Sequence, residues 1–260
     1  MPDPTFNLTV LISGNGSNLQ ALIDACAGGK LPNARVTHVI SNRKAAYGLE
    51  RARRAHIPTT YHNLVPYKKA HPDSIDAARE AYDADLASLI LKPGTSTSTS
   101  TAPDTTPSSS TTDPTHPTND KNPTISQQPP IPHLIICAGW MHILSPSFLN
   151  PLSQSSIPVI NLHPALPGTF AGAGAIERAW EAARTERLDK TGVMVHEMIA
   201  EVDAGDAVVV AEVELPRNED GVYAESLEEL ENRVHKVEHG LIVEGARRVL
   251  ERIRGESAGK

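Results

Sequence analysis

The most constraining feature of the chain is a nearly continuous apolar run, HLIICAGW, at residues 133–140. A strand that is apolar on both faces is typical of a parallel sheet covered by helices on both sides. A second run, IPVINLHP at residues 157–164, has the same character. These two runs predict two central strands of a sheet that is buried on both faces.

The remaining sequence alternates between short β-rich runs and segments of helical periodicity. Further strands are expected at residues 8–12, 35–41, 57–62, 191–198 and 207–214, and helices at 18–26, 45–56, 72–91, 174–184 and 224–254. This alternation, with its short connections, predicts an α/β fold with an open, mostly parallel, Rossmann-like sheet and helices on both faces. Ligands of such sheets bind in a crevice at the carboxyl ends of the strands.

One segment, at about 93–131, does not fit this alternation, because residues 93–130 consist almost entirely of Ser, Thr, Pro, Asp and Asn. Such a composition buries too little apolar surface to offset the entropy of ordering it. A long flexible loop adds only a slowly growing closure cost. We therefore expect one domain over residues 1–260, interrupted by a disordered insertion.

Charge and cysteine content narrow the possible partners. The net charge is -7 and the pI is about 5.9, which argues against a nucleic acid or a membrane surface as partner. The two cysteines, Cys26 and Cys137, lie far apart, so neither a disulfide framework nor a structural metal site is expected. A small-molecule partner and a cytoplasmic location are the expectation.

A glycine-containing loop follows the first expected strand, in VLISGNGSNLQALIDA at residues 10–25. A dinucleotide fingerprint requires a third glycine where Leu19 stands and an acid after the second strand, and both are missing. A helix start with free N–H groups still favours an anion, so Gly16, Ser17 and Asn18 are candidates for binding a phosphate. The alternative is that Ser17 or Asn18 merely caps the helix.

A second group of polar residues follows later strands. Asn161 and His163 lie in NLHPALPG, and Asp203 lies in the turn of GVMVHEMIAEVDAGDAVV. Single histidines and turn carboxylates are usually structural. Together, an amide, a histidine and a carboxylate form a plausible acyl-transfer set, with an oxyanion stabiliser, a proton carrier and a group that orients the carrier.

With these motifs, and with AGWMHILS at residues 138–145, the sequence resembles the phosphoribosylglycinamide formyltransferases of purine synthesis, particularly the single-function fungal and bacterial forms. The resemblance covers nearly the whole chain except the insertion. It implies that the amine of glycinamide ribonucleotide attacks the formyl carbon of 10-formyltetrahydrofolate. Asn161 and His163 would stabilise the oxyanion, and Asp203 would assist His163.

The resemblance also implies binding roles. Gly16, Ser17 and Asn18 would hold the substrate phosphate, and Glu238 would meet the ribose, although helical periodicity alone would place Glu238 on a solvated face. The implied folate-binding residues are Met141, His142, Ile143, Leu144, Ile199, Ala200, Glu201 and Val202. The implied partners are these two small molecules, with no nucleic acid, membrane or metal, and the chain is expected to be a monomer or a weak homodimer.

Two alternatives remain open at this stage. Another formyl-handling enzyme, such as a formyltetrahydrofolate hydrolase or a methionyl-tRNA formyltransferase, would use the same Asn, His and Asp, but with an additional domain. A noncatalytic sensor of a phosphate ligand would keep the glycine loop and would not need Asn161, His163 and Asp203 together. His196 fits either a site residue or a structural strand residue, and Asp206 competes with Asp203 for its role.

Overall fold

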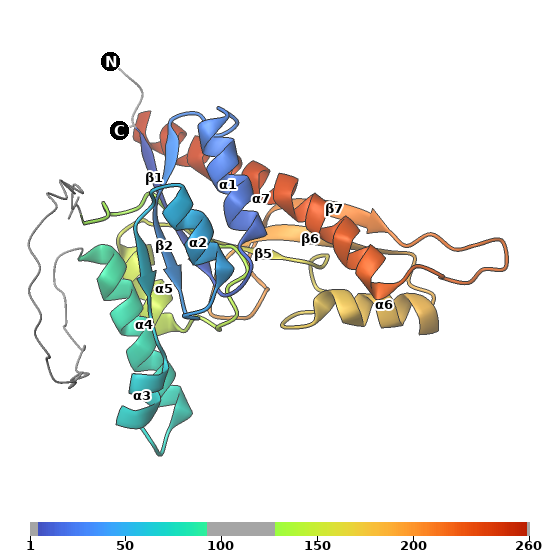
Figure 1. Ribbon diagram of the computed structural model, residues 1–260, viewed down its shortest axis with the longest axis horizontal. Helices are drawn as coiled ribbons and strands as arrows, with labels where there is room; N and C mark the ends of the chain where they lie inside the picture. The colour runs from blue at the N-terminus through green and yellow to red at the C-terminus, as the bar shows by residue number, and fades with distance from the viewer. Residues whose placement is uncertain (1–4, 93–127, 259–260) are drawn as a thin grey trace, which may run out of the picture.

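The protein is built on one seven-stranded sheet with the strand order β3-β2-β1-β4-β5-β6-β7 (Figure 1). The computed structural model describes residues 5–92 and 128–258. The strands are β1 (Phe6–Ile12), β2 (Ala34–Ser41), β3 (Thr59–Tyr61), β4 (Leu134–Cys137), β5 (Val159–His163), β6 (Lys190–Glu197) and β7 (Ala207–Glu214). The five strands from β3 to β5 pair in parallel, whereas β6 pairs antiparallel with both β5 and β7. The expectation of an open, mostly parallel sheet is confirmed.

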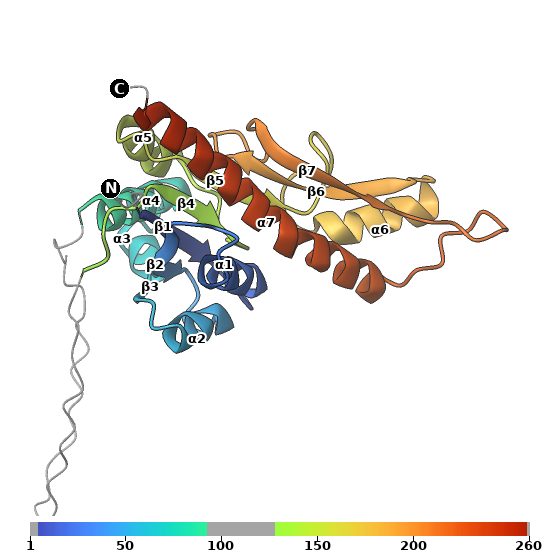
Figure 2. The ribbon, with the colours of Figure 1, turned by 90° about the horizontal axis from the view of Figure 1, so that it is seen from above.

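Helices cover both faces of the sheet. They are α1 (Ser17–Ala27), α2 (Tyr47–Arg54), α3 (Val65–Ala70), α4 (Ile75–Leu91), α5 (Pro146–Gln154), α6 (Ala175–Thr185) and α7 (Leu227–Ala258). Helices α1, α2, α6 and α7 contribute to one apolar core, and α4 and α5 contribute to the other. Figure 2 shows the long helix α7 running from the side of α6 along β6 and β7 and past α1.

The alternation of side chains along a strand explains how one strand serves both cores. In β4, Leu134 and Ile136 belong to the α1/α7 core, whereas Ile135 and Cys137 belong to the α4/α5 core. All four side chains are almost fully buried. The apolar run at residues 133–140 therefore contains a central strand with helices on both sides, as predicted.

Two helices, α3 and α5, were missed by the sequence analysis. Both are short and carry proline in the first turn, and α5 has a second proline, Pro151, inside it. Prolines and short length obscure the apolar period that reveals a helix. The expected helix at 72–91 begins only at Ile75, because the Ser74 side chain accepts a hydrogen bond from the Ala77 N–H and caps it.

The sheet has its topological switch between β1 and β4, since the chain proceeds from β1 outward to β2 and β3 and then returns to β4. The carboxyl ends of β1, β4 and β5 therefore meet at one edge, while α4 leads back to the opposite, amino edge, where β4 begins.

Most of the expected insertion at 93–131 lies outside the described residues. Within the described ranges, no helix combines the length and apolar character needed to cross a bilayer.

Candidate active site

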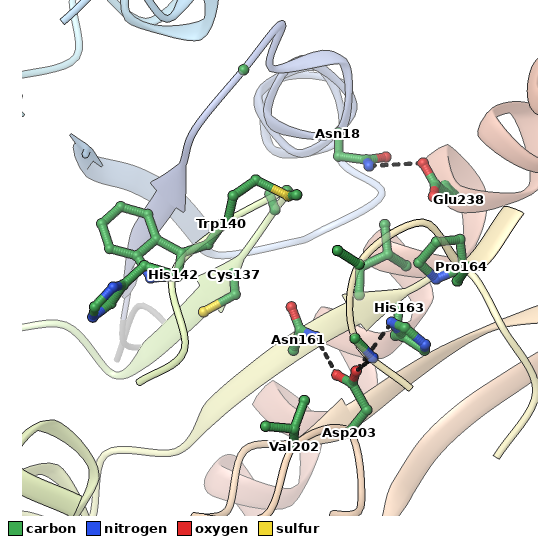
Figure 3. A pocket seen from close by; sticks show the side chains of 18 of the residues that line it. Asn18, Cys137, Trp140, His142, Asn161, His163, Pro164, Val202, Asp203 and Glu238 are labelled. Carbon is green, nitrogen blue, oxygen red and sulfur yellow. Dashed lines mark hydrogen bonds and ion pairs between the residues drawn. The ribbon is translucent and has the colours of Figure 1, made fainter. Parts of the chain in front are cut away.

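A cavity of about 500 Å³ lies at the carboxyl ends of β1, β4 and β5 (Figure 3). The sequence-predicted residues that line it are Gly16, Ser17, Asn18, Met141, His142, Ile143, Leu144, Asn161, His163, Ile199, Ala200, Val202, Asp203 and Glu238. Glu201 is exposed and is not among its lining residues. Segments far apart in the sequence thus form one cavity, as the sheet topology requires.

The glycine loop forms the first wall of the cavity. Gly16 is the N-cap position of α1, in the left-handed conformation with φ of 76°, and no side chain caps the helix. The first N–H groups of α1 are therefore not used by Ser17 or Asn18, and the capping alternative is wrong. Arg51 of α2 holds the loop from outside, with Nε 3.0 Å from the Asn15 carbonyl and Nη2 2.9 Å from Asn15 Oδ1.

A buried hydrogen bond joins this loop to the last helix. Asn18 Nδ2 donates to Glu238 Oε2 at 3.1 Å, and both side chains are more than nine-tenths buried. Asn18 Oδ1 is buried without a hydrogen-bond partner among the described residues. A buried polar atom without a partner is costly, so this oxygen is a candidate for contact with a ligand donor. Glu238 is thus a cavity residue and does not lie on a solvated helix face.

The carboxylate of Asp203 is the centre of the second wall. His163 Nδ1 lies 3.4 Å from its Oδ2, and the Gly172 N–H donates to the same oxygen at 2.8 Å. Asn161 Nδ2 donates to Oδ1 at 3.3 Å, and His196 Nε2 lies at the same distance from that oxygen. Asp203 therefore contacts both the amide and the histidine that the sequence pointed to.

Asp203 reaches this position because its loop folds back over the sheet. Strand β6 runs antiparallel to β5, with Glu197 paired with Ile160, so the end of β6 does not itself point at the cavity. The return is possible because Gly205 packs directly on Glu197, where a Cβ would lie 1.8 Å from the Glu197 carbonyl oxygen. Asp203 adopts φ of 54° in this turn, while the Asp206 carbonyl oxygen accepts from the Glu197 N–H.

The surroundings of Asp203 and of His163 shift the pKa values of both side chains. Burial raises the pKa of Asp203, but hydrogen bonds from His196 and the Gly172 N–H outweigh it and hold this pKa at about 2. Burial lowers the pKa of His163 below its usual range, and the negative charge of Asp203 opposes this shift only in part. The cluster therefore pairs a stable carboxylate with an imidazole that is readily neutral, which is suited to proton transfer.

The hydrogen bonds of Asn161 and His163 show what a ligand must displace. In Figure 3 the Asn161 amide nitrogen faces Asp203, and its oxygen points away from that carboxylate. The same nitrogen lies 3.2 Å from His196 Nε2, and His163 Nε2 lies 3.1 Å from the Phe170 carbonyl oxygen. Donation to a substrate oxygen therefore requires Asn161 or His163 to give up one of these contacts.

An apolar wall also lines the cavity. Met141 and Ile143 are 63% and 61% exposed, although both line the cavity, and Ile199 and Val202 face the same space. The Met141 N–H donates to Ser13 Oγ at 2.8 Å, which ties the segment after β4 to the end of β1. Exposed apolar side chains gathered at a cavity mouth are typical of a ligand-binding surface.

Some cavity residues were not predicted from the sequence. His235 lies one helical turn before Glu238, and this spacing was the available signal. Cys137 ends β4, and burial raises the pKa of its thiol to about 12, so it behaves as an apolar wall residue. Among the described side chains, no group of three or more His, Cys, Asp or Glu could hold a metal ion.

A glycine loop and an Asn–His–Asp cluster at the carboxyl edge of one sheet place the chain among the α/β enzymes. Residues 6–91 and 108–245 match the family described as formyl transferase, and the chain belongs to this family. The resemblance found in the sequence is therefore confirmed.

Individual relatives agree with this assignment. The chain is 44% identical over 245 residues to a phosphoribosylglycinamide formyltransferase of Schizosaccharomyces pombe, covering 94% of this chain and 97% of that protein. It is 40% identical over 253 residues to the enzyme of the same name from Saccharomyces cerevisiae, covering 95% and 98%. A crystal structure of glycinamide ribonucleotide transformylase 1 from Symbiobacterium toebii matches with a TM-score of 0.66 and 28% identity, covering 94% of this chain and 86% of that one.

Proposed function

We propose that the protein transfers a formyl group from 10-formyltetrahydrofolate to the amine of glycinamide ribonucleotide in purine biosynthesis. One observation supports this most strongly: a single cavity joins the glycine loop of α1 to the contacting Asn161, His163 and Asp203. The names of the relatives specify the reaction, and the chain covers nearly all of their length. A cytosolic location and a monomeric or weakly dimeric state stay predictions.

The glycine loop is the proposed ribonucleotide end of the cavity. The free N–H groups at the start of α1, together with Ser17 and Asn18, would hold the phosphate, because a helix N-terminus favours an anion. Glu238 would accept hydrogen bonds from the ribose hydroxyl groups. The free Oδ1 of Asn18 is an additional acceptor at this end.

The apolar wall is the proposed folate end. Met141, Ile143 and Leu144 on one side, and Ile199 and Val202 on the other, offer the apolar surfaces that a flat heterocycle requires. His142 and Ala200 line the same part of the cavity. Glu201 is proposed here only through the backbone of its loop, since its side chain is exposed outside the cavity.

The proposed chemistry proceeds at the Asp203 cluster. The amine nitrogen forms a bond to the formyl carbon, the bond from that carbon to the folate nitrogen breaks, and one amine proton ends on that nitrogen. Asn161 and His163 stabilise the negative oxygen of the intermediate, and His163 carries the proton. Asp203 keeps its charge because of its low pKa and stabilises the imidazolium form of His163.

The test is a formyl-transfer assay with the full chain, run with and without glycinamide ribonucleotide. Wild-type protein should transfer the formyl group only when the ribonucleotide is present. His163→Ala should lower kcat by about 100-fold or more with a modest change in binding, because it removes an oxyanion stabiliser. His71→Ala, at an exposed position outside the cavity, is the matched control and should leave kcat unchanged.

The outcomes separate the alternatives. Release of formate without the ribonucleotide would identify a hydrolase. Binding of the ribonucleotide without any turnover would identify a sensor. Either result, or a near-normal rate for His163→Ala, contradicts the proposal.

A further inference from the structure

A fully buried carboxylate lies behind the apolar wall of the cavity, outside the Asp203 cluster. Asp83, on α4, has no exposed surface. Its Oδ1 lies 2.8 Å from His142 Nε2, and its Oδ2 accepts from the Ser145 N–H at 2.7 Å. Both partners belong to one short segment, residues 141–145, which follows β4.

Burying a carboxylate is costly unless it is hydrogen-bonded, and two short bonds to one segment meet that requirement. Around the pair, the His142 ring makes edge contacts with Tyr82 and Trp140, and its side chain is only 8% exposed. The His142 imidazole thus faces the protein interior, and in Figure 3 it points away from Asn161, His163 and Asp203. It is not placed as a free charged group for a ligand.

The segment is fixed at both ends. At its start, the Met141 N–H donates to Ser13 Oγ, and at its end the Ser145 N–H donates to Asp83. The exposed apolar side chains of Met141 and Ile143 lie between these two anchors. A wall that is held in place before the ligand arrives loses less entropy on binding.

We infer that Asp83 is a positioning residue for the folate end of the cavity, acting through His142 and the Ser145 N–H. This inference rests on the proposed function, because that function assigns the wall of residues 141–144 to the folate. Asp83 touches neither substrate and takes no part in the proton transfer. Its effect is on the shape of one end of the cavity only.

The experiment compares Asp83→Ala with Asp85→Ala, two residues further along α4. Asp85 also accepts a hydrogen bond, from the Tyr67 hydroxyl at 2.8 Å, but its side chain is exposed and this bond does not involve residues 141–145. Asp83→Ala should raise KM for 10-formyltetrahydrofolate, and the Kd for tetrahydrofolate, by about tenfold, since it leaves two buried donors unpaired. Asp85→Ala should change neither value, and neither variant should change kcat or KM for the ribonucleotide more than about twofold.

A conservative variant separates positioning from general stability. In Asp83→Asn, the amide oxygen can accept from the Ser145 N–H, and the amide nitrogen can donate to His142 in its other tautomer. This variant should therefore keep folate binding within about threefold of wild type. His142→Ala should weaken folate binding in the same direction as Asp83→Ala, and it serves as the second test if Asp83→Ala fails to fold.

Three results would overturn the inference: equal loss of affinity for both substrates, a loss in kcat alone, or unchanged folate binding in a folded Asp83→Ala or His142→Ala variant. The Kd for tetrahydrofolate is measured by calorimetry without turnover. Failure of the proposed function instead appears as absent formyl transfer in the wild-type protein, so the two failures are distinguishable.

Discussion

Gly16 and Gly48 meet backbone to backbone where the glycine loop packs on α2. A Cβ on Gly16 would lie 2.6 Å from the Gly48 Cα, and the Gly48 N–H donates to the Gly14 carbonyl oxygen at 3.1 Å. The contact fixes the loop that begins α1. The contact also explains why glycine is required both at position 16, at the start of α1, and at position 48, in α2.

Gly16→Ala should therefore impair ribonucleotide binding and folding together. The left-handed φ alone costs about 1 kcal/mol, and the clash with Gly48 adds to it. We expect KM for the ribonucleotide to rise by about tenfold or more and the free energy of unfolding to fall. Gly29→Ala is the control, because Gly29 has φ of 75° with nothing within 4 Å of a Cβ, so it should show the strain without the change in KM.

Asp203→Asn should lower kcat by about 100-fold, because the amide no longer stabilises a positive charge on His163. Asp206→Asn, three residues later, is the matched control, since Asp206 contributes only its backbone carbonyl to Glu197 among the described contacts. Steady-state kinetics of the two variants decide between these aspartates. Equal losses in both would show that Asp203 has no special role.

Arg51→Lys should weaken ribonucleotide binding by about fivefold and leave kcat unchanged. The two Arg51 nitrogens bind both oxygens of Asn15, a fork that a lysine ammonium cannot reproduce. Arg53→Lys on the same helix, where the side chain is exposed and pairs only loosely with Glu50, provides the comparison. A titration with the ribonucleotide measures the affinity of both variants, and equal affinities would show that Arg51 does not support the glycine loop.

His38 should make folding stability depend on pH. Burial lowers the pKa of His38 to about 4, below the usual histidine value of about 6.5, so the unfolded chain binds more protons between these two pH values. The free energy of unfolding should fall as pH drops from about 6.5 to about 4. His38→Gln, which can keep the hydrogen bond to Thr60, should reduce this loss in urea titrations at pH 7 and pH 4.5. An equally steep loss in the variant would contradict the assignment.

Much of the architecture could be predicted because it depends on local patterns. The apolar character of β4 and the periodicity of α1 and α7 are properties of consecutive residues. Local patterns do not predict short helices such as α3 and α5, because prolines interrupt their apolar periodicity. The antiparallel direction of β6 depends on pairing with distant strands and has no local signature.

The site was predictable to the extent that its residues follow strands. His163 ends β5 and Asn161 lies two residues before it, so the topology alone brings both to the cavity. The contact between Asp203 and His163 depends on the close packing of Gly205 on Glu197, which folds the loop back. No sequence motif predicts this packing. The burial of Asp83 is harder still to predict, because a carboxylate on an amphipathic helix is usually solvated. Only the packing of the folded chain shows that Asp83 is buried.

The connection between α4 and β4 has a practical consequence. Helix α4 ends at Leu91 and β4 begins at Leu134, at the amino edge of the sheet, whereas the cavity lies at the carboxyl edge. A reporter or an affinity tag inserted directly after α4 or directly before β4 would be attached at the edge of the sheet remote from the cavity.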